Sequence, residues 1–333
     1  MTRSLIVLPD DSGQPLLDAI AGAKKSIRIK MFLFSDPSLL KAIIDAQKRG
    51  VDVRVMLNPA RRDGEEENAD TRKALIAGGV KVLDSNPEFD LTHEKSMVID
   101  DTTAFVQSLN WETKNLTSTR DYAIVTTHKH EVDEIAHCFD ADWKREKFDS
   151  TSQKHLIWCV GNGRLRLGEI IDSARHSLWV QNERYQDPVI IEHIIRAHVR
   201  GVKVRVMARP PHKLKKDKLI EGVSGLRSLQ DLGVKIHKLK GIKLHAKLIL
   251  ADDARAIIGS INLAPGSFDS RRELAIEVND EHIVKRIKKT LEHDWENSHQ
   301  LDLSDEALLA ELKETDPNVE EDLALSGKNH KNK

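Results

Sequence analysis

The chain has 333 residues, of which 39% are hydrophobic and 32% are charged, so it can bury a sizeable core and still present a well-solvated surface. Its formal net charge is −1, which excludes a strong overall field for nucleic acid or anionic lipid, so any attraction for phosphate must be local. Two cysteines, Cys138 and Cys159, are too few for a disulfide framework, and no apolar stretch is long enough to span a membrane. These features predict a cytoplasmic protein whose cysteines are small buried residues.

Predicted strands and helices alternate through the first half of the chain. A short apolar run at 5–8 indicates a buried strand. Apolar spacing then predicts a strand over 26–34, a helix over 37–49, a strand over 51–57 and a helix over 70–77. Further strands are predicted at 80–83, 95–99, 104–107 and 121–126, followed by a helix over 129–147. This order is typical of an α/β fold with a mixed central sheet flanked by helices.

The second half of the chain repeats the first. The segment 49–55 recurs at 200–206 with an offset of 151 residues, and 140–143 matches 292–295 with an offset of 152. A register held over so long a distance indicates a duplicated domain.

Three regions follow from the repeat. We predict two lobes, 1–150 and 151–300, which pack about a pseudo-twofold axis as homodimers pack about a true one. The remaining segment, 301–333, is predicted to hold one helix over 304–315 and a polar, disordered tail.

A set of polar residues is shared by both repeats at fixed spacing. It comprises His93, Lys95, Asp100, Ser108, Asn110 and Asp121 in the first copy, and His245, Lys247, Asp252, Ser260, Asn262 and Glu273 in the second. Because alternate residues of a strand share a face, His93 and Lys95 are expected on one strand, with Ser108 and Asn110 on the next. A third strand, beginning near Asp121, is expected to place a carboxylate behind the histidine. Two facing copies would form one phosphate site with an attacking histidine on one side and a proton donor on the other.

These residues resemble the phospholipase D superfamily. Residues 93–100 and 245–252 both match its HxKxxxxD signature, and residues 259–262 match the GSxN element that follows. Glu273 falls where small nucleases of the family carry a histidine-orienting glutamate. The first copy departs by Gln107 in place of glycine, expected to narrow the approach to the phosphate, and by Asp121 in place of glutamate.

The resemblance implies a division of roles. His93 would be the nucleophile and form a phosphohistidine, while His245 would protonate the leaving alcohol and then activate water or an acceptor alcohol. The other roles implied are phosphoryl binding by Lys95, Lys247, Asn110 and Asn262, tautomer fixing by Asp121 and Glu273 with help from Ser108 and Ser260, and turn stabilisation by Asp100 and Asp252. No metal or cofactor is implied, because lysines supply the positive charge.

Several alternatives remain open from the sequence. The substrate is expected to be a phospholipid, cleaved by hydrolysis or transphosphatidylation, with cardiolipin synthase-like chemistry as a variant and peripheral contact with a membrane. A metal-independent nuclease of the same superfamily and a non-catalytic phosphate-binding scaffold are the other readings. We expect a monomer.

Three further features carry weaker expectations. The basic residues of 213–218 form either a solvated loop or one that steers an anionic substrate. Residues 161–163 are expected to connect a strand to a helix rather than to bind a dinucleotide. The histidines at 128 and 130 are expected to start a solvated helix rather than to bind metal.

Overall fold

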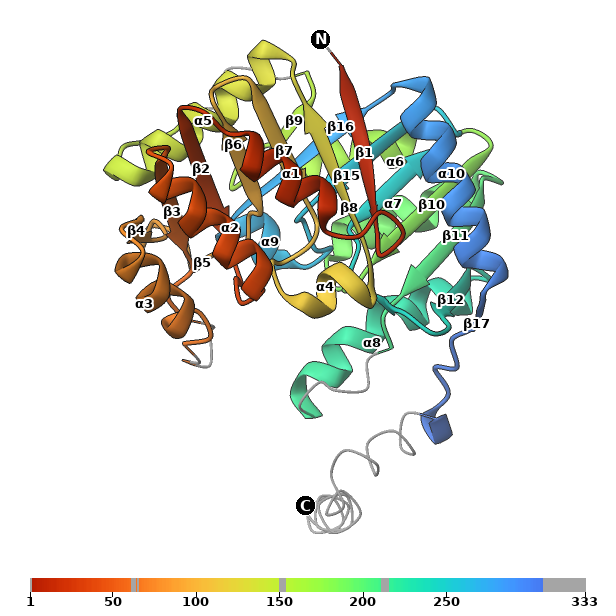
Figure 1. Ribbon diagram of the computed structural model, residues 1–333. Coiled ribbons are helices and arrows are strands. Elements are labelled where there is room, and N and C mark those ends of the chain that lie inside the picture. Colours follow the sequence, from red (N-terminus) through yellow and green to blue (C-terminus); the bar gives the residue numbers. More distant parts are fainter. Residues whose placement is uncertain (1, 61–63, 65, 150–153, 211–215, 308–333) are drawn as a thin grey trace, which may run out of the picture.

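Two β-sheets, one built mainly from each half of the chain, form the centre of the molecule (Figure 1). The structure, a computed structural model, describes residues 2–60, 64, 66–149, 154–210 and 216–307. The predicted α/β class, with two duplicated lobes that each hold a mixed sheet flanked by helices, is confirmed.

The first sheet has the strand order β1-β8-β7-β6-β2-β3-β4. Its strands are β1 (Arg3–Leu8), β2 (Ser26–Met31), β3 (Asp52–Leu57), β4 (Lys81–Asp84), β6 (Ser96–Ile99), β7 (Thr103–Gln107) and β8 (Thr119–Thr126). Strands β2, β3 and β4 run parallel, and the other neighbours pair antiparallel. The parallel strands require crossovers, which helices supply.

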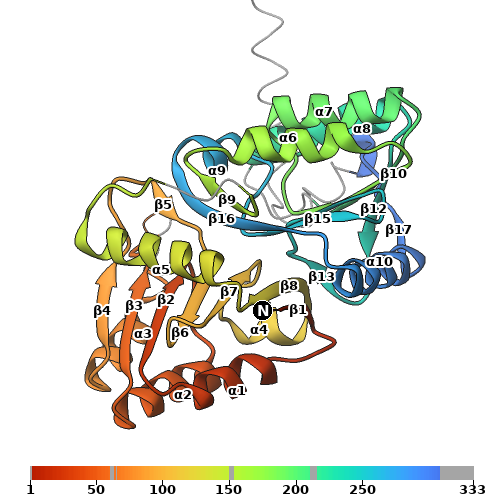
Figure 2. The same ribbon diagram turned by 90° about the horizontal axis from the view of Figure 1, so that it is seen from above.

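Helices cover both faces of this sheet (Figure 2). The outer face carries α1 (Gln14–Gly22), α2 (Pro37–Lys48) and α3 (Ala69–Ala77), whose apolar residues share one core with the strands. Helix α2 begins at a capped turn, because the Asp36 carboxylate accepts hydrogen bonds from the backbone N–H groups of Ser38 and Leu39. Helix α5 (Lys129–Lys144) lies on the inner face and packs into the core between the two sheets.

The second lobe repeats this plan. Its sheet has the order β17-β12-β11-β10-β14-β15-β16, and β9 also pairs with β16. The strands are β9 (Leu156–Cys159), β10 (Ser177–Asn182), β11 (Lys203–Ala208), β12 (Lys235–Leu239), β14 (Leu248–Ala251), β15 (Arg255–Gly259), β16 (Arg271–Val278) and β17 (Ser298–Gln300). The helices are α6 (Gly163–Ser173), α7 (Pro188–Val199) and α8 (Lys216–Asp231) outside, and α10 (Glu281–Glu296) inside. Residues 161 and 162 connect β9 to α6, which begins at Gly163, so the segment joins a strand to a helix as predicted.

The lobes exchange one short strand each. Strand β5 (Leu91–Thr92) of the first repeat pairs parallel with β16, and β13 (Lys243–Leu244) of the second pairs parallel with β8. The exchange continues into the next residue, since the His93 N–H donates to the Arg272 carbonyl and the His245 N–H to the Arg120 carbonyl. Each histidine is therefore anchored to the opposite lobe.

Two buried ion pairs also cross between the lobes. Arg120 of β8 binds Asp294 of α10 through two hydrogen bonds of 2.9 and 2.8 Å. Arg272 of β16 binds Asp142 of α5 at 3.0 Å. The two aspartates belong to the matched segments 140–143 and 292–295, so this part of the sequence repeat is explained by contact between the lobes.

Observed elements differ from the predicted ones mainly at their ends. Strand β2 stops at Met31 instead of residue 34, because the chain turns away and Phe34 forms an isolated bridge with Trp111. Helix α5 stops at Lys144 instead of residue 147, since Arg145 adopts a left-handed conformation. No helix in the described part of the chain is long and apolar enough to cross a membrane.

Parts of three predictions fall on residues that the structure does not describe. Of the predicted helix over 304–315, residues beyond 307 lie outside the described residues, and so does the polar tail. In the basic segment, residues 213 and 215 also lie outside them, while Lys216 begins α8.

Cys138 and Cys159 are both buried, and neither forms a disulfide.

Candidate active site

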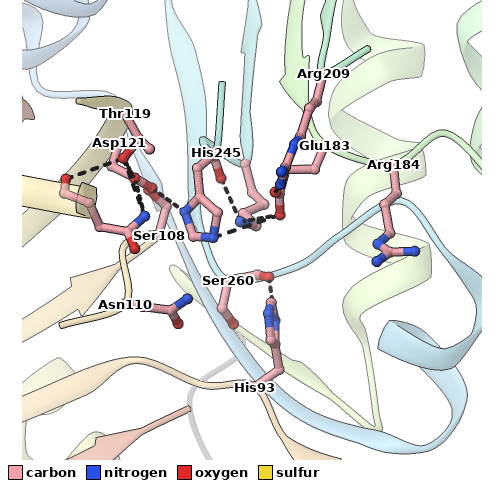
Figure 3. Close-up of polar contacts among 12 residues, drawn as sticks. His93, Ser108, Asn110, Thr119, Asp121, Glu183, Arg184, Arg209, His245 and Ser260 are labelled. Carbon is pink, nitrogen blue, oxygen red and sulfur yellow. Dashed lines mark hydrogen bonds and ion pairs between the residues drawn. The ribbon is translucent and has the colours of Figure 1, made fainter. Parts of the chain in front are cut away.

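One cleft between the lobes contains the histidines of both repeats (Figure 3). It has a volume of about 880 Å³ and is lined by His93 and Asn110 from the first repeat and by His245 and Asn262 from the second. The exchanged strands bring these side chains together, although the two histidines are 152 positions apart in the sequence.

The predicted histidines, lysines, serines and asparagines of the site lie at the ends of strands rather than within them. His93 and Lys95 occupy the connector between β5 and β6, and His245 and Lys247 the one between β13 and β14. Ser108 and Ser260, with the asparagines two residues on, follow the ends of β7 and β15. The prediction that each pair shares a strand is therefore wrong. After β5 and after β13 the chain passes from one sheet to the other, so the regular hydrogen bonding between strands is interrupted at these residues.

Each histidine is paired with the carboxylate of the other repeat. His93 Nδ1 lies 2.9 Å from Glu273 Oε2 on β16, and His245 Nδ1 lies 2.8 Å from Asp121 Oδ1 on β8. The expectation that each carboxylate stands behind the histidine of its own lobe is wrong, because β5 and β13 carry the histidines across the interface.

The surroundings of His93 favour a neutral imidazole. Burial holds the pKa of His93 well below its ordinary value, and the charges of Lys95 and Lys247 lower it further. The Nδ1 hydrogen faces Glu273 and the Ser260 carbonyl oxygen, 3.1 Å away. This arrangement leaves the Nε2 lone pair available as a nucleophile.

Asp121 is fixed from four directions. Its Oδ1 accepts from Ser108 Oγ at 2.6 Å as well as facing His245, and its Oδ2 accepts from Thr119 Oγ1 at 2.6 Å and Asn115 Nδ2 at 3.2 Å. Burial alone would raise the pKa of Asp121, but His245 and the hydrogen bonds outweigh it and the pKa is lowered. Burial instead raises the pKa of Glu273, against the opposing charge of Lys95. The pKa values of the two carboxylates are thus shifted in opposite directions.

Both lysines are buried beside the histidines. Lys95 Nζ donates to the His93 carbonyl and lies 5.1 Å from the centre of the Phe32 ring. Lys247 Nζ donates to the His245 carbonyl. Burial, followed by the charge of Lys247, lowers the pKa of Lys95 to about 7. The two ammonium groups are therefore held close enough to repel each other and to attract an anion.

The remaining predicted residues divide into two groups. Asn110 and Asn262 line the cleft, and the Oδ1 atom of each amide has no protein partner among the described residues. Asp100 and Asp252 instead bind the backbone. Their carboxylates accept from the N–H groups of Lys24, Lys25 and Ser26 and of Arg175, His176 and Ser177, respectively, at 2.6 to 2.9 Å. Gln107 does not line the cleft, because its side chain accepts from Trp111 Nε1 in the core.

Glu183 is a cleft residue that sequence comparison of the repeats missed. It follows β10, and its Oε2 atom lies 3.0 Å from Lys247 Nζ and 3.7 Å from His245 Nε2 (Figure 3). The matching position of the first repeat is Phe32. A search for polar residues common to both copies excludes such a position, and only a search for differences would have found it.

One cluster has side chains of the kind that bind metals. Glu94, Cys138 and Asp142 are buried together. However, the Lys30 ammonium lies 3.1 Å from Glu94, 3.1 Å from the Cys138 sulfur and 2.6 Å from Asp142, so a cation of the protein itself already neutralises these ligands. Burial raises the pKa of Cys138 to about 12, which leaves the thiol protonated and a poor ligand.

A family model described as the cardiolipin synthase, phospholipase D-like domain matches residues 16–143 and again residues 167–295. The chain belongs to the phospholipase D superfamily. Among curated proteins, this phospholipase D-like chain is 22% identical to cardiolipin synthase 1 of Bacillus cereus over 90% of its own length and 67% of that protein. It spans about two thirds of the length of this relative.

Solved structures share the fold of this phospholipase D-like protein. Phosphatidylserine synthase of Haemophilus influenzae Rd KW20 superposes with a TM-score of 0.65 at 14% identity, covering 89% of this chain and 87% of that one. Polyphosphate kinase of Porphyromonas gingivalis gives a TM-score of 0.70 at 15% identity, covering 90% and 48%.

Proposed function

We propose that this protein is a phosphodiesterase of phospholipase D type that transfers phosphatidyl groups to water or to an alcohol through a phosphohistidine on His93. The observation that carries the proposal is the pairing of two histidines with two carboxylates in one cleft. Each Nδ1 atom is held at 2.8 or 2.9 Å by a buried carboxylate, so each Nε2 atom is left for chemistry.

The reaction proceeds in two steps. His93 Nε2 attacks phosphorus, the bond from phosphorus to the leaving oxygen breaks, and His245 gives that oxygen a proton. Water or an acceptor alcohol then gives a proton to His245 and attacks phosphorus, which breaks the phosphorus–nitrogen bond. Lys95 and Lys247, with the amides of Asn110 and Asn262, offset the charge on the phosphoryl oxygens.

A phospholipid is the preferred substrate class. The name of the Bacillus cereus relative and that of the Haemophilus influenzae structure both refer to phospholipid synthesis. The net charge of −1 supports the same choice, since a sequence-independent nuclease draws its affinity from a basic groove. Peripheral contact with a membrane follows from such a substrate.

The test is a side-by-side assay of the purified protein with phosphatidylglycerol, phosphatidylcholine and single-stranded DNA. Cleavage or transfer of a phospholipid that is lost in His93→Ala would support the proposal. Cleavage of DNA alone would establish the nuclease alternative instead. Absence of turnover on every phosphodiester would favour a phosphate-binding scaffold.

A further inference from the structure

The two halves of the cleft differ at one matched pair of positions. Phe32 follows β2 and Glu183 follows β10, with the same spacing to the bridge residues Phe34 and Tyr185. On the first side, the Phe32 ring lies 4.9 Å from the His93 ring in an edge arrangement. On the second side, a carboxylate takes the place of this apolar ring.

The Glu183 carboxylate is partly buried, with its side chain 12% exposed, and cations surround it. Its Oε1 atom lies 2.9 Å from Arg209 Nη1, which follows β11, and its Oε2 atom lies 3.0 Å from Lys247 Nζ. Burial alone would raise the pKa of Glu183, but Lys247, His245 and Arg209 hold it well below the ordinary value. Glu183 is therefore ionised near neutral pH.

This carboxylate makes the two histidines unequal as proton carriers. A protonated His245 ring has Asp121 at Nδ1, 2.8 Å away, and Glu183 at Nε2, 3.7 Å away. A protonated His93 ring would also have Glu273 at Nδ1, but it lies beside the apolar Phe32 ring, and the positive charges of Lys95, Lys247 and Arg271 outweigh the charge of Glu183 there. The charged groups nearest the pair are Asp121 from β8, Glu273 from β16, Glu183 after β10, Arg209 after β11, Arg271 of β16, and Lys95 and Lys247 beside the histidines. The cleft is also lined by Glu112, Lys114, Arg184 and Lys243.

We infer that Glu183 is a positioning residue that assigns the roles in the cleft, keeping the proton on His245 and leaving His93 neutral to attack. The inference rests on the proposed function. In the first step the proton on His245 Nε2 passes to the leaving oxygen, and in the second step the incoming water or alcohol restores it. Glu183 favours both the initial and the restored state, because its charge lies beside the nitrogen that gives and regains the proton.

Glu183 has a second consequence for substrate binding. In the free protein it shares Lys247 with the His245 carbonyl, so Lys247 must divide its interaction between Glu183 and an incoming phosphate. Removing the carboxylate charge should therefore strengthen phosphate binding and weaken proton transfer at once. A residue with a merely structural role would instead weaken both or neither.

The test compares Glu183→Gln, which keeps the shape and removes the charge, with the wild-type protein on two phosphodiesters. On phosphatidylglycerol, whose leaving alcohol needs a proton, kcat should fall about tenfold near neutral pH. The alkaline limb of its kcat profile, which reports on the complex with phosphate already bound beside Lys95, should move by about one unit to lower pH, and KM should fall or stay level. On an activated p-nitrophenyl phosphodiester, the burst rate should stay within about twofold.

Two further variants sharpen the result. Glu112→Gln removes a charge from the same cleft, where Glu112 contacts Lys114 at 2.7 Å and accepts from Asn110 Nδ2 at 3.3 Å but contacts neither histidine. Its KM can change through Asn110, but its alkaline limb should stay in place. Glu183→Asp keeps the charge and should recover part of kcat, which also covers the case that the glutamine variant folds poorly. An unmoved alkaline limb, or equal losses on both esters, would overturn the role of Glu183 while leaving the proposed function intact. A wild-type protein inactive on both esters would overturn the proposed function and this inference together.

Discussion

The crossed pairing of histidines and carboxylates makes a prediction that the sequence order alone would reverse. Asp121 belongs to the repeat of His93 but binds His245, and Glu273 belongs to the repeat of His245 but binds His93. Asp121→Asn should therefore impair the steps that need His245 as proton carrier. Glu273→Gln should impair the attack by His93.

The size of the effect follows from the contact. At 2.8 Å the bare attraction between a carboxylate and an imidazolium is about 6 kcal/mol with an effective dielectric constant of about 20, which is an upper bound. A hydrogen bond to a charged group contributes about 1.5 to 3 kcal/mol net. Because about 1.4 kcal/mol corresponds to a factor of ten, kcat of Asp121→Asn should fall by about 10- to 150-fold.

A rapid-quench burst on an activated p-nitrophenyl phosphodiester separates the two variants. This leaving group needs little protonation, so Asp121→Asn should still form the phosphoenzyme and then stall, because water is not activated for the second step. Glu273→Gln should form it slowly or not at all. If Asp121→Asn abolished the burst while Glu273→Gln preserved it, the crossed arrangement would have no functional meaning.

Three other predictions concern pH, metal and stability. Because the pKa of Lys95 is lowered to about 7, Lys95 loses its charge as the pH rises above that value. The kcat/KM for bis(p-nitrophenyl) phosphate should then fall by up to about tenfold for each pH unit. A kcat/KM profile that stays flat to about pH 9 would contradict this. Excess EDTA should leave the rate unchanged, because lysines offset the phosphoryl charge, and a loss restored by zinc or magnesium would reveal a metal site. Asp294→Asn leaves the buried Arg120 with the half-exposed Asp10 as its remaining ionic partner, and it should lower the free energy of unfolding in urea by about 3 kcal/mol. Asp269→Asn, in a partly exposed pair with Arg164, should cost about 1 kcal/mol or less, and equal losses would show that burial of the first pair is unimportant.

The sequence predicts the fold and the site well where local pattern and duplication decide the structure. Apolar spacing predicted both ends of α2 and of β3 to within one residue, and shared polar positions identified both histidines of the cleft. Such patterns report which face of an element is buried and which residues two copies hold in common.

The exchange of short strands between the lobes could not be predicted from the sequence, for a physical reason. Strands β5 and β13 have two residues each, too few to show an alternating pattern, and their partners are chosen by packing between the lobes. The assignment of Asp121 to His93 failed with it. Glu183 was missed because the two copies have different residues at this position. Its role depends on Lys247 and His245, which are its neighbours only in three dimensions.

The most direct test of a single site built from both repeats is to locate the covalent intermediate. The protein is mixed with labelled phosphatidylglycerol, quenched in alkali during the first turnover, digested and mapped by mass spectrometry. We expect the phosphatidyl label on His93, approaching one per chain, with none in His93→Ala and label retained in His245→Ala when an activated ester replaces the lipid. Label on His245, or on both histidines in equal amounts, would contradict a site in which His93 attacks and His245 carries the proton.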